Sequence, residues 1–115
     1  MIDLAQRSCV PCRGGVPPMS PDEAAELLRQ LGGDWELAEV SPSVTGLRKV
    51  YGFKDFAEAL AYVNRVGAIA EDQGHHPDIE LAWGRVTVTV WTHKIKGLTE
   101  SDFIFAAKCD RAASQ

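Results

Sequence analysis

All three histidines of this 115-residue chain lie in one short stretch, at positions 75, 76 and 93. Imidazole is the side chain that both takes up and releases protons near neutral pH. Two or three imidazoles around one pocket can therefore act as acid and base in a single turnover. Three solvated, idle histidines are the simpler interpretation, but convergence of His75, His76 and His93 on one face would favour proton-transfer chemistry.

Two carboxylates and one aromatic side chain stand close to these histidines. Asp102 falls at the third position of an expected helix, where a carboxylate caps the helix and interacts favourably with its dipole. Glu71 falls near the end of another expected helix, where it is either a surface residue or a partner that orients His75. Trp91 alternates with His93 along a strand, so its ring either stacks on a planar ligand or covers a subunit interface.

A zinc site is another interpretation of the same residues. Its ligands would come from one set: His75, His76 and His93 with Asp102 or Glu71. Neighbouring histidines usually point apart in an extended chain, however, and the helical spacing H-E-x-x-H is absent. We therefore predict a site without a metal.

Three helices are expected, because three capping boxes precede apolar residues at helical spacing. The boxes are Ser20 with Glu23, Asp55 with Glu58, and Thr99 with Asp102. The helices should cover about residues 20–31, 55–73 and 99–111, and glycines at 32 and 74 should end the first two.

Alternating apolar residues predict four strands, over residues 35–40, 47–53, 79–83 and 86–91. The order is therefore helix, two strands, helix, two strands, helix (αββαββα). This order predicts an α+β fold, a four-stranded antiparallel sheet with three helices on one face.

The last two strands should form a hairpin that determines where the histidines lie. If Gly84 and Arg85 form a type II′ loop, Trp83 lies opposite Val86, and continuing the ladder places His76 opposite His93. One face then carries the apolar residues and packs on the helices: Ile79, Leu81, Trp83, Val86, Val88 and Val90. The open face carries the polar residues and one tryptophan: His76, Asp78, Glu80, Trp91 and His93.

Length and composition limit the classes of protein that this chain can represent. A chain of this length forms one domain, expected over residues 20–115, with a flexible arm over residues 1–19. The formal charge of -4 disfavours non-specific binding to nucleic acid. Neither a secretory signal nor an apolar stretch that could span a bilayer is present, so we expect a cytoplasmic protein.

The arm contains Cys9 and Cys12, whose spacing is found in metal and redox sites. A structural zinc needs four ligands, and the only other cysteine, Cys109, falls in an expected helix. We therefore favour an ordinary arm.

One run of residues matches the signature of a known family along its whole length: Glu71, three residues, His75-His76-Pro77, five residues, Trp83, nine residues, His93, eight residues, Asp102. The chain thus resembles the pterin-4a-carbinolamine dehydratases, also called 4a-hydroxytetrahydrobiopterin dehydratases. The similarity includes Trp35 and residues 51–56, and it extends from about Ser20 to the end of the chain.

The resemblance implies an activity and an assembly. It implies the same α+β fold, built into homodimers or homotetramers without a cofactor, a membrane partner or direct contact with nucleic acid. The implied reaction removes water from a 4a-hydroxytetrahydropterin to give the quinonoid dihydropterin, and so recycles the tetrahydropterin used by aromatic amino acid hydroxylases.

The resemblance also implies roles for individual residues. His75 and His93 are expected to be the acid/base pair, and His76 is expected to assist catalysis and to hold the pterin. We expect Pro77 and Trp91 to contact the substrate beside His76.

The implied supporting residues are the two carboxylates. Asp102 is expected to orient His93 or His76, and Glu71 is expected to support His75.

Relatives of this fold also include proteins that do not act as enzymes. Similar proteins serve as dimerisation cofactors of a homeodomain transcription factor, as assembly factors for carbon-fixing enzymes, or in molybdopterin metabolism. A non-catalytic interaction or assembly factor is therefore the alternative function. The presence of every expected catalytic position in this chain favours the enzyme.

Overall fold

The computed structural model describes residues 4–9 and 17–114. Its elements follow in the order η1 (Leu4–Gln6), α1 (Pro21–Leu31), β1 (Glu36–Ser41), β2 (Val44–Gly52), α2 (Phe56–Gln73), β3 (Asp78–Ala82), β4 (Arg85–Val90) and α3 (Glu100–Ala113). The predicted order of three helices and four strands is confirmed, with a short 3-10 helix added at the start. None of the helices in the described residues is long and apolar enough to cross a membrane.

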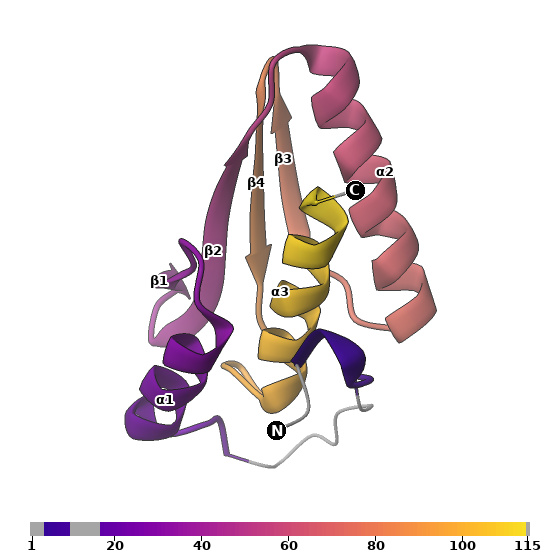
Figure 1. Cartoon of the computed structure of the whole chain (residues 1–115). Coiled ribbons are helices and arrows are strands. Elements are labelled where there is room, and N and C mark those ends of the chain that lie inside the picture. The colour runs from indigo at the N-terminus through magenta and orange to yellow at the C-terminus, as the bar shows by residue number, and fades with distance from the viewer. Residues whose placement is uncertain (1–3, 10–16, 115) are drawn as a thin grey trace.

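The four strands form one antiparallel sheet in the order β1-β2-β4-β3. The α-helices cover one face of it: α2 packs on β3 and β4, α3 lies beside α2 and contacts β2, and α1 lies on the β1–β2 side (Figure 1). The expected α+β fold is therefore confirmed.

The ends of α1 and α2 show why the chain is helical there. Ser20 accepts a hydrogen bond from the backbone N–H of Glu23, and Asp55 accepts one from the N–H of Glu58 at 2.9 Å. Gly74 ends α2 in the left-handed conformation, at a φ of 64°. The next residue, His75, therefore leaves the helix in a direction set by this cap.

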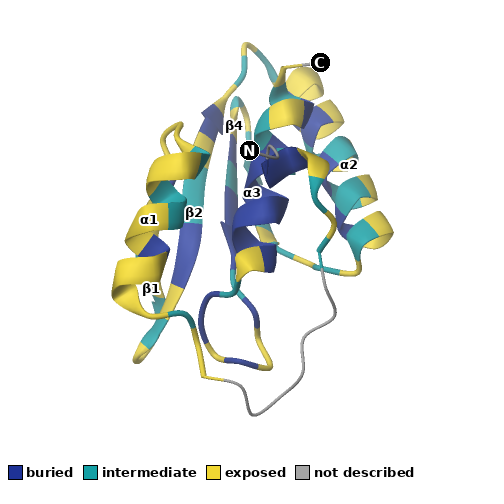
Figure 2. Cartoon of the chain, turned by 60° about the horizontal axis from the view of Figure 1, so that its bottom comes forward, coloured by how far each residue is buried: buried dark blue, intermediate teal, exposed yellow. Residues whose placement is uncertain are grey.

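The core lies between the sheet and the helices, and α3 is the most deeply buried of the three α-helices (Figure 2). Four aliphatic side chains of β2 and β4 are completely inaccessible to solvent: Leu47, Val86, Val88 and Val90. They meet two phenylalanines of α3, Phe103 and Phe105, which are also fully buried. Burial of apolar surface on this scale holds the first turn of α3, and with it Asp102, in a defined position.

The β3–β4 hairpin has a different register from the one that the sequence predicts. Leu81 pairs with Val86, and residues 83 and 84 form the loop, neither of them at positive φ. The predicted loop at residues 84–85 and its type II′ geometry are therefore wrong. The cause is a contact with another segment: the N–H of Phe53 donates to the carbonyl of Gly84 at 2.8 Å, and a Cβ at position 84 would lie 2.8 Å from the carbonyl oxygen of Phe53.

The corrected register shifts the pairing by two residues, so each side chain keeps its face of the sheet. The core positions of the apolar alternation are confirmed except at Trp83, which lies in the loop and is 70% exposed. The ladder ends where Asp78 pairs with Thr89, so the predicted pairing of His76 with His93 does not form. Pro77 follows His76 and cannot donate a ladder hydrogen bond, which is consistent with this end point.

The segment before α1 contains the short helix η1, which contacts the core. Leu4 and Ala5 are buried in η1, which packs against α3. The Lys108 ammonium donates to the carbonyl of Ala5 at 2.8 Å. Apolar side chains of η1 therefore pack on the core, within the segment of residues 1–19 for which the sequence predicts a flexible arm.

Candidate active site

The candidate site forms where the end of α2, the end of β4 and the start of α3 meet. His75 follows the cap of α2, and its Nε2 lies 2.6 Å from Oδ1 of Asp102 in the first turn of α3. The Asp102 side chain is completely buried, and the His75 side chain is 11% exposed. The imidazole thus bridges a buried carboxylate and the surface of the protein.

The buried carboxylate has hydrogen-bond donors on both oxygens. Besides the contact of His75 with Oδ1, Oδ2 of Asp102 accepts the hydroxyl of Thr92 and the backbone N–H of Thr99, each at 2.9 Å. Burial of a carboxylate is unfavourable unless such donors compensate for lost water. The donors to Oδ2 therefore define the direction in which Oδ1 faces His75.

His75 is also held by contacts of its own. Its backbone N–H donates to the carbonyl of Ala70 at 3.2 Å, as part of the cap of α2. Its ring packs at a tilt against Phe105, with ring centroids 5.9 Å apart. The position of the imidazole is therefore determined by both α2 and α3.

His76 has a separate partner on the surface. Its Nε2 lies 2.6 Å from Oε2 of Glu71, which is in the last turns of α2. These side chains are 61% and 81% exposed, in contrast to the buried pair of His75 and Asp102.

The carboxylate partners of the histidines differ from those expected. Asp102 contacts His75 rather than His93 or His76, and Glu71 contacts His76 rather than His75. Neighbouring side chains point in opposite directions when the chain is extended. One of the two adjacent imidazoles consequently turns inward to α3, and the other turns outward to α2.

Trp91 and His93 lie together just after β4, as the alternation of the strand predicts. Their ring centroids are 4.5 Å apart and their planes make an angle of 50°. Trp91 is partly buried and His93 is exposed. Between them, Thr92 contacts Asp102, so the segment that carries both rings is tied to the carboxylate that holds His75.

Thr92 is the site residue that the sequence reasoning missed. It is 4% exposed and donates directly to Asp102. The alternation of side chains along β4 could have indicated it. Residue 92 falls on the same face as Val90, toward the helices, whereas Trp91 falls on the other face.

A second polar cluster lies two turns further along α3, around Asp110. Its carboxylate accepts hydrogen bonds from the hydroxyl of Tyr51 at 2.6 Å, the ammonium of Lys49 at 2.8 Å and the indole N–H of Trp35 at 3.1 Å. Burial raises the pKa of Tyr51, and the phenol's hydrogen bond to the Asp110 carboxylate raises it further. Since these donors come from β2 and from the residue just before β1, the cluster anchors the sheet to α3 at the end away from the histidines.

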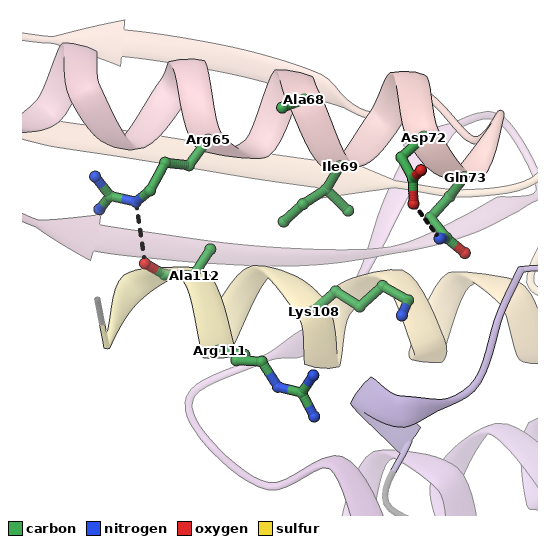
Figure 3. Close-up of a pocket in the computed structure, with 8 residues that line it drawn as sticks. All are labelled: Arg65, Ala68, Ile69, Asp72, Gln73, Lys108, Arg111 and Ala112. Atoms are coloured by element: carbon green, nitrogen blue, oxygen red, sulfur yellow. Dashed lines mark hydrogen bonds between the residues drawn. The ribbon is translucent and has the colours of Figure 1, made fainter.

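One groove on this surface is lined by none of the histidines. It runs between α2 and α3 and has a volume of about 370 Å³ (Figure 3). Cationic side chains of this groove take part in the fold: Arg65 donates to the carbonyl of Ala112 at 3.1 Å, and Lys108 donates to that of Ala5. The groove therefore belongs to the packing of the helices and of η1.

Within residues 4–9 and 17–114, no three His, Cys, Asp or Glu side chains are grouped as metal ligands. His75 and His76 each pair with a different carboxylate. Cys9 donates its backbone N–H to the side chain of Gln73 at 2.8 Å. Cys12, its possible partner in a metal or redox site, lies outside the described residues.

The fold and the site together define an α+β domain in which a buried carboxylate holds an imidazole. Residues 17–112 match the sequence profile of the family described as Pterin 4 alpha carbinolamine dehydratase. Since this match covers most of the chain, the protein belongs to that family, and the resemblance noted in the sequence is confirmed.

Two relatives illustrate how far the similarity extends. A protein of Rubrobacter xylanophilus is 56% identical over 111 residues, which is 96% of this chain and 99% of its own length. A protein of Alkaliphilus metalliredigens is 46% identical over 115 residues, the full length of both chains. Each carries a provisional name as a pterin-4-alpha-carbinolamine dehydratase.

Solved structures share the fold. A transcriptional coactivator/pterin dehydratase from Brucella melitensis has a TM-score of 0.74 and 32% identity, covering 84% of this chain and 98% of its own. A pterin dehydratase-like protein identified as a RuBisCO assembly factor in the alpha-carboxysome has a TM-score of 0.62 and covers 74% of this chain and 95% of its own. At 23% identity, the second comparison shows the fold alone.

Proposed function

We propose that this protein dehydrates 4a-hydroxytetrahydropterin to quinonoid dihydropterin and water. In this role it recycles tetrahydropterin for an aromatic amino acid hydroxylase. The observation that carries the proposal is the imidazole of His75 on a fully buried Asp102, in a chain that belongs to this family. A buried carboxylate that orients an imidazole is a typical arrangement for proton transfer.

The reaction requires one proton to be delivered and one to be removed. The bond between C4a and the hydroxyl oxygen breaks, and an acid protonates the oxygen so that it leaves as water. A base takes the proton from a ring nitrogen, whose electron pair forms the new double bond to C4a. No electron is gained or lost overall, so acid/base groups are sufficient for the chemistry.

We assign the acid and the base to His75 and His93. His75 has the buried support of Asp102, and His93 lies in the segment that Thr92 joins to the same carboxylate. The carboxylate of Asp102 thus contacts the ring of His75 directly and is joined through Thr92 to the backbone segment that carries His93.

We assign substrate binding to His76, Pro77 and Trp91, with His76 also assisting catalysis. The ring of Trp91 beside His93 supports this assignment, because a pterin is planar and stacks on aromatic rings. The carboxylate of Glu71 orients His76 through its hydrogen bond. We further propose that the protein works in the cytoplasm as a homodimer or homotetramer. Light scattering after gel filtration would measure the number of subunits.

A stopped-flow assay tests the activity directly. The substrate is 4a-hydroxytetrahydropterin generated enzymatically, and the dehydration rate is compared with and without the protein. We expect acceleration that persists after treatment with a metal chelator. A rate no faster than in buffer would reject the enzyme and favour a non-catalytic interaction or assembly factor. Loss of activity on chelation, together with zinc in elemental analysis, would favour a metal-dependent enzyme.

A further inference from the structure

Thr92 is not one of the histidines or carboxylates discussed above, yet its hydroxyl lies inside their network. The side chain is buried, and Oγ1 is 2.9 Å from Oδ2 of Asp102 and 3.0 Å from Oγ1 of Thr99. A hydroxyl has one proton to donate. Because a carboxylate only accepts, the proton of Thr92 goes to Asp102, and the hydroxyl of Thr99 must then donate to Thr92.

This direction of donation has a consequence for His75. With Oδ2 occupied by donors, Oδ1 of Asp102 faces Nε2 of His75 at 2.6 Å. The carboxylate accepts there too, so we assign the proton of neutral His75 to Nε2. Nδ1 is then the nitrogen that exchanges a proton with a substrate.

The backbone of Thr92 is held as firmly as its side chain. Its N–H donates to the carbonyl of Gly97 at 2.9 Å, and its carbonyl accepts from the N–H groups of Ile95 and Lys96. These bonds close the turn in which His93 lies. One residue therefore contacts the support of His75 and anchors the turn that carries His93.

We propose that Thr92 is a positioning residue that couples the two imidazoles. Its hydroxyl holds Asp102 in the rotation that keeps the proton of His75 on Nε2, and its backbone holds the turn of His93 next to the same carboxylate. This role in catalysis rests on the proposed dehydration, whereas the effect on His75 does not.

The test uses three variants of the full chain. Thr92→Val keeps the shape and removes the hydroxyl, and Thr92→Ser keeps the hydroxyl. Thr89→Val is the matched control, because Thr89 is a buried threonine of β4, three residues before Thr92, that contacts Arg48 instead of Asp102. Nitrogen-15 NMR of the His75 ring, recorded without substrate, reports which nitrogen carries the proton. Stopped-flow dehydration gives kcat and KM separately.

We expect Thr92→Val to lower kcat by about one order of magnitude with little change in KM, because a displaced proton-transfer group affects the reaction more than binding. The same variant should raise the fraction of His75 with its proton on Nδ1. In Thr92→Ser and in Thr89→Val, kcat and the fraction of His75 with its proton on Nδ1 should both match the unaltered protein.

Two results would overturn the proposal: a Thr92→Val protein with the unaltered His75 spectrum, or a Thr92→Ser protein as impaired as Thr92→Val. If the unaltered protein shows no dehydration, the proposed function fails, while the His75 spectra still decide whether Thr92 orients this ring.

Discussion

At the scale of single residues, two adjacent histidines have very different surroundings. His75 is 11% exposed on a buried carboxylate, and His76 is 61% exposed on a surface one. The neighbours cannot replace each other, because extended backbone sends them to opposite sides. The pairing with Asp102 and Glu71 was not predictable from spacing, since it depends on where α3 and α2 lie in three dimensions.

Replacement of either proposed acid/base residue should affect the rate without affecting the fold. We expect His75→Ala and His93→Ala each to slow dehydration by about two orders of magnitude, because each removes a proton-transfer group. Circular dichroism should show a folded protein in both cases; thermal melting should be unchanged for the exposed His93 but lowered for His75→Ala, which removes a partner of the buried Asp102. Unchanged rates in both variants would refute the assignment.

At the scale of elements, α3 carries two aspartates with different tasks. Asp102 supports His75 in the first turn, and Asp110 joins Trp35, Lys49 and Tyr51 two turns later. The sequence indicated Asp102 through the capping box and the family signature. It gave no comparable signal for Asp110, because that cluster depends on the packing of β2 against α3.

Substitution of each aspartate by asparagine should separate these tasks. Asp102→Asn should lower kcat by up to about two orders of magnitude, because an amide that donates to Nε2 would move the proton of His75 to Nδ1. Asp110→Asn should leave kcat unchanged and lower the free energy of unfolding by about 1–3 kcal/mol. Urea titration and stopped-flow assays measure the two effects. Equal kcat losses in the two variants would contradict this division.

The β3–β4 hairpin shows which parts of a sheet can be predicted from sequence. The alternation of apolar residues identified the faces correctly, because a shift of two residues preserves them. The register itself was not predictable from the loop residues, because it depends on a contact between Gly84 and Phe53. The error moved Trp83 from the predicted core to the exposed loop.

Two glycine substitutions should test this account of the register. A Cβ at position 84 would lie 2.8 Å from the carbonyl oxygen of Phe53, so Gly84→Ala should destabilise the protein by about 1–3 kcal/mol. Gly67→Ala is the control, because no atom lies within 4 Å of a Cβ there and the residue is inside α2. It should stabilise the protein by about 0.5–1 kcal/mol. Urea titration of both proteins would show opposite signs, and a neutral Gly84→Ala would contradict the contact.

At the scale of the whole molecule, the sheet and the helix layer are joined at both ends of α3 by a carboxylate. The Asp110 end determines how the protein responds to alkaline pH. Burial raises the pKa of Tyr51 and of Tyr62 above the ordinary value of about 10. Above that pH the unfolded chain loses phenolic protons that the folded protein keeps. The folded state then binds more protons, so the free energy of unfolding falls as pH rises.

Tyr51→Phe should reduce this alkaline loss of stability. Each phenol that keeps its proton only in the folded state contributes a slope of about 1.4 kcal/mol per pH unit. The free energy of unfolding of the variant should therefore fall less steeply above pH 10, while at neutral pH it is lower by about 1.5–3 kcal/mol because the hydrogen bond to Asp110 is lost.

Trp35→Phe is the matched control, because it removes another donor to Asp110 without removing a titrating group. Its free energy of unfolding should be lower at neutral pH, but the dependence of that free energy on pH above pH 10 should be unchanged. Urea titrations from neutral to alkaline pH measure both quantities, and equal slopes in the two variants would show that Tyr51 releases its proton in the folded protein.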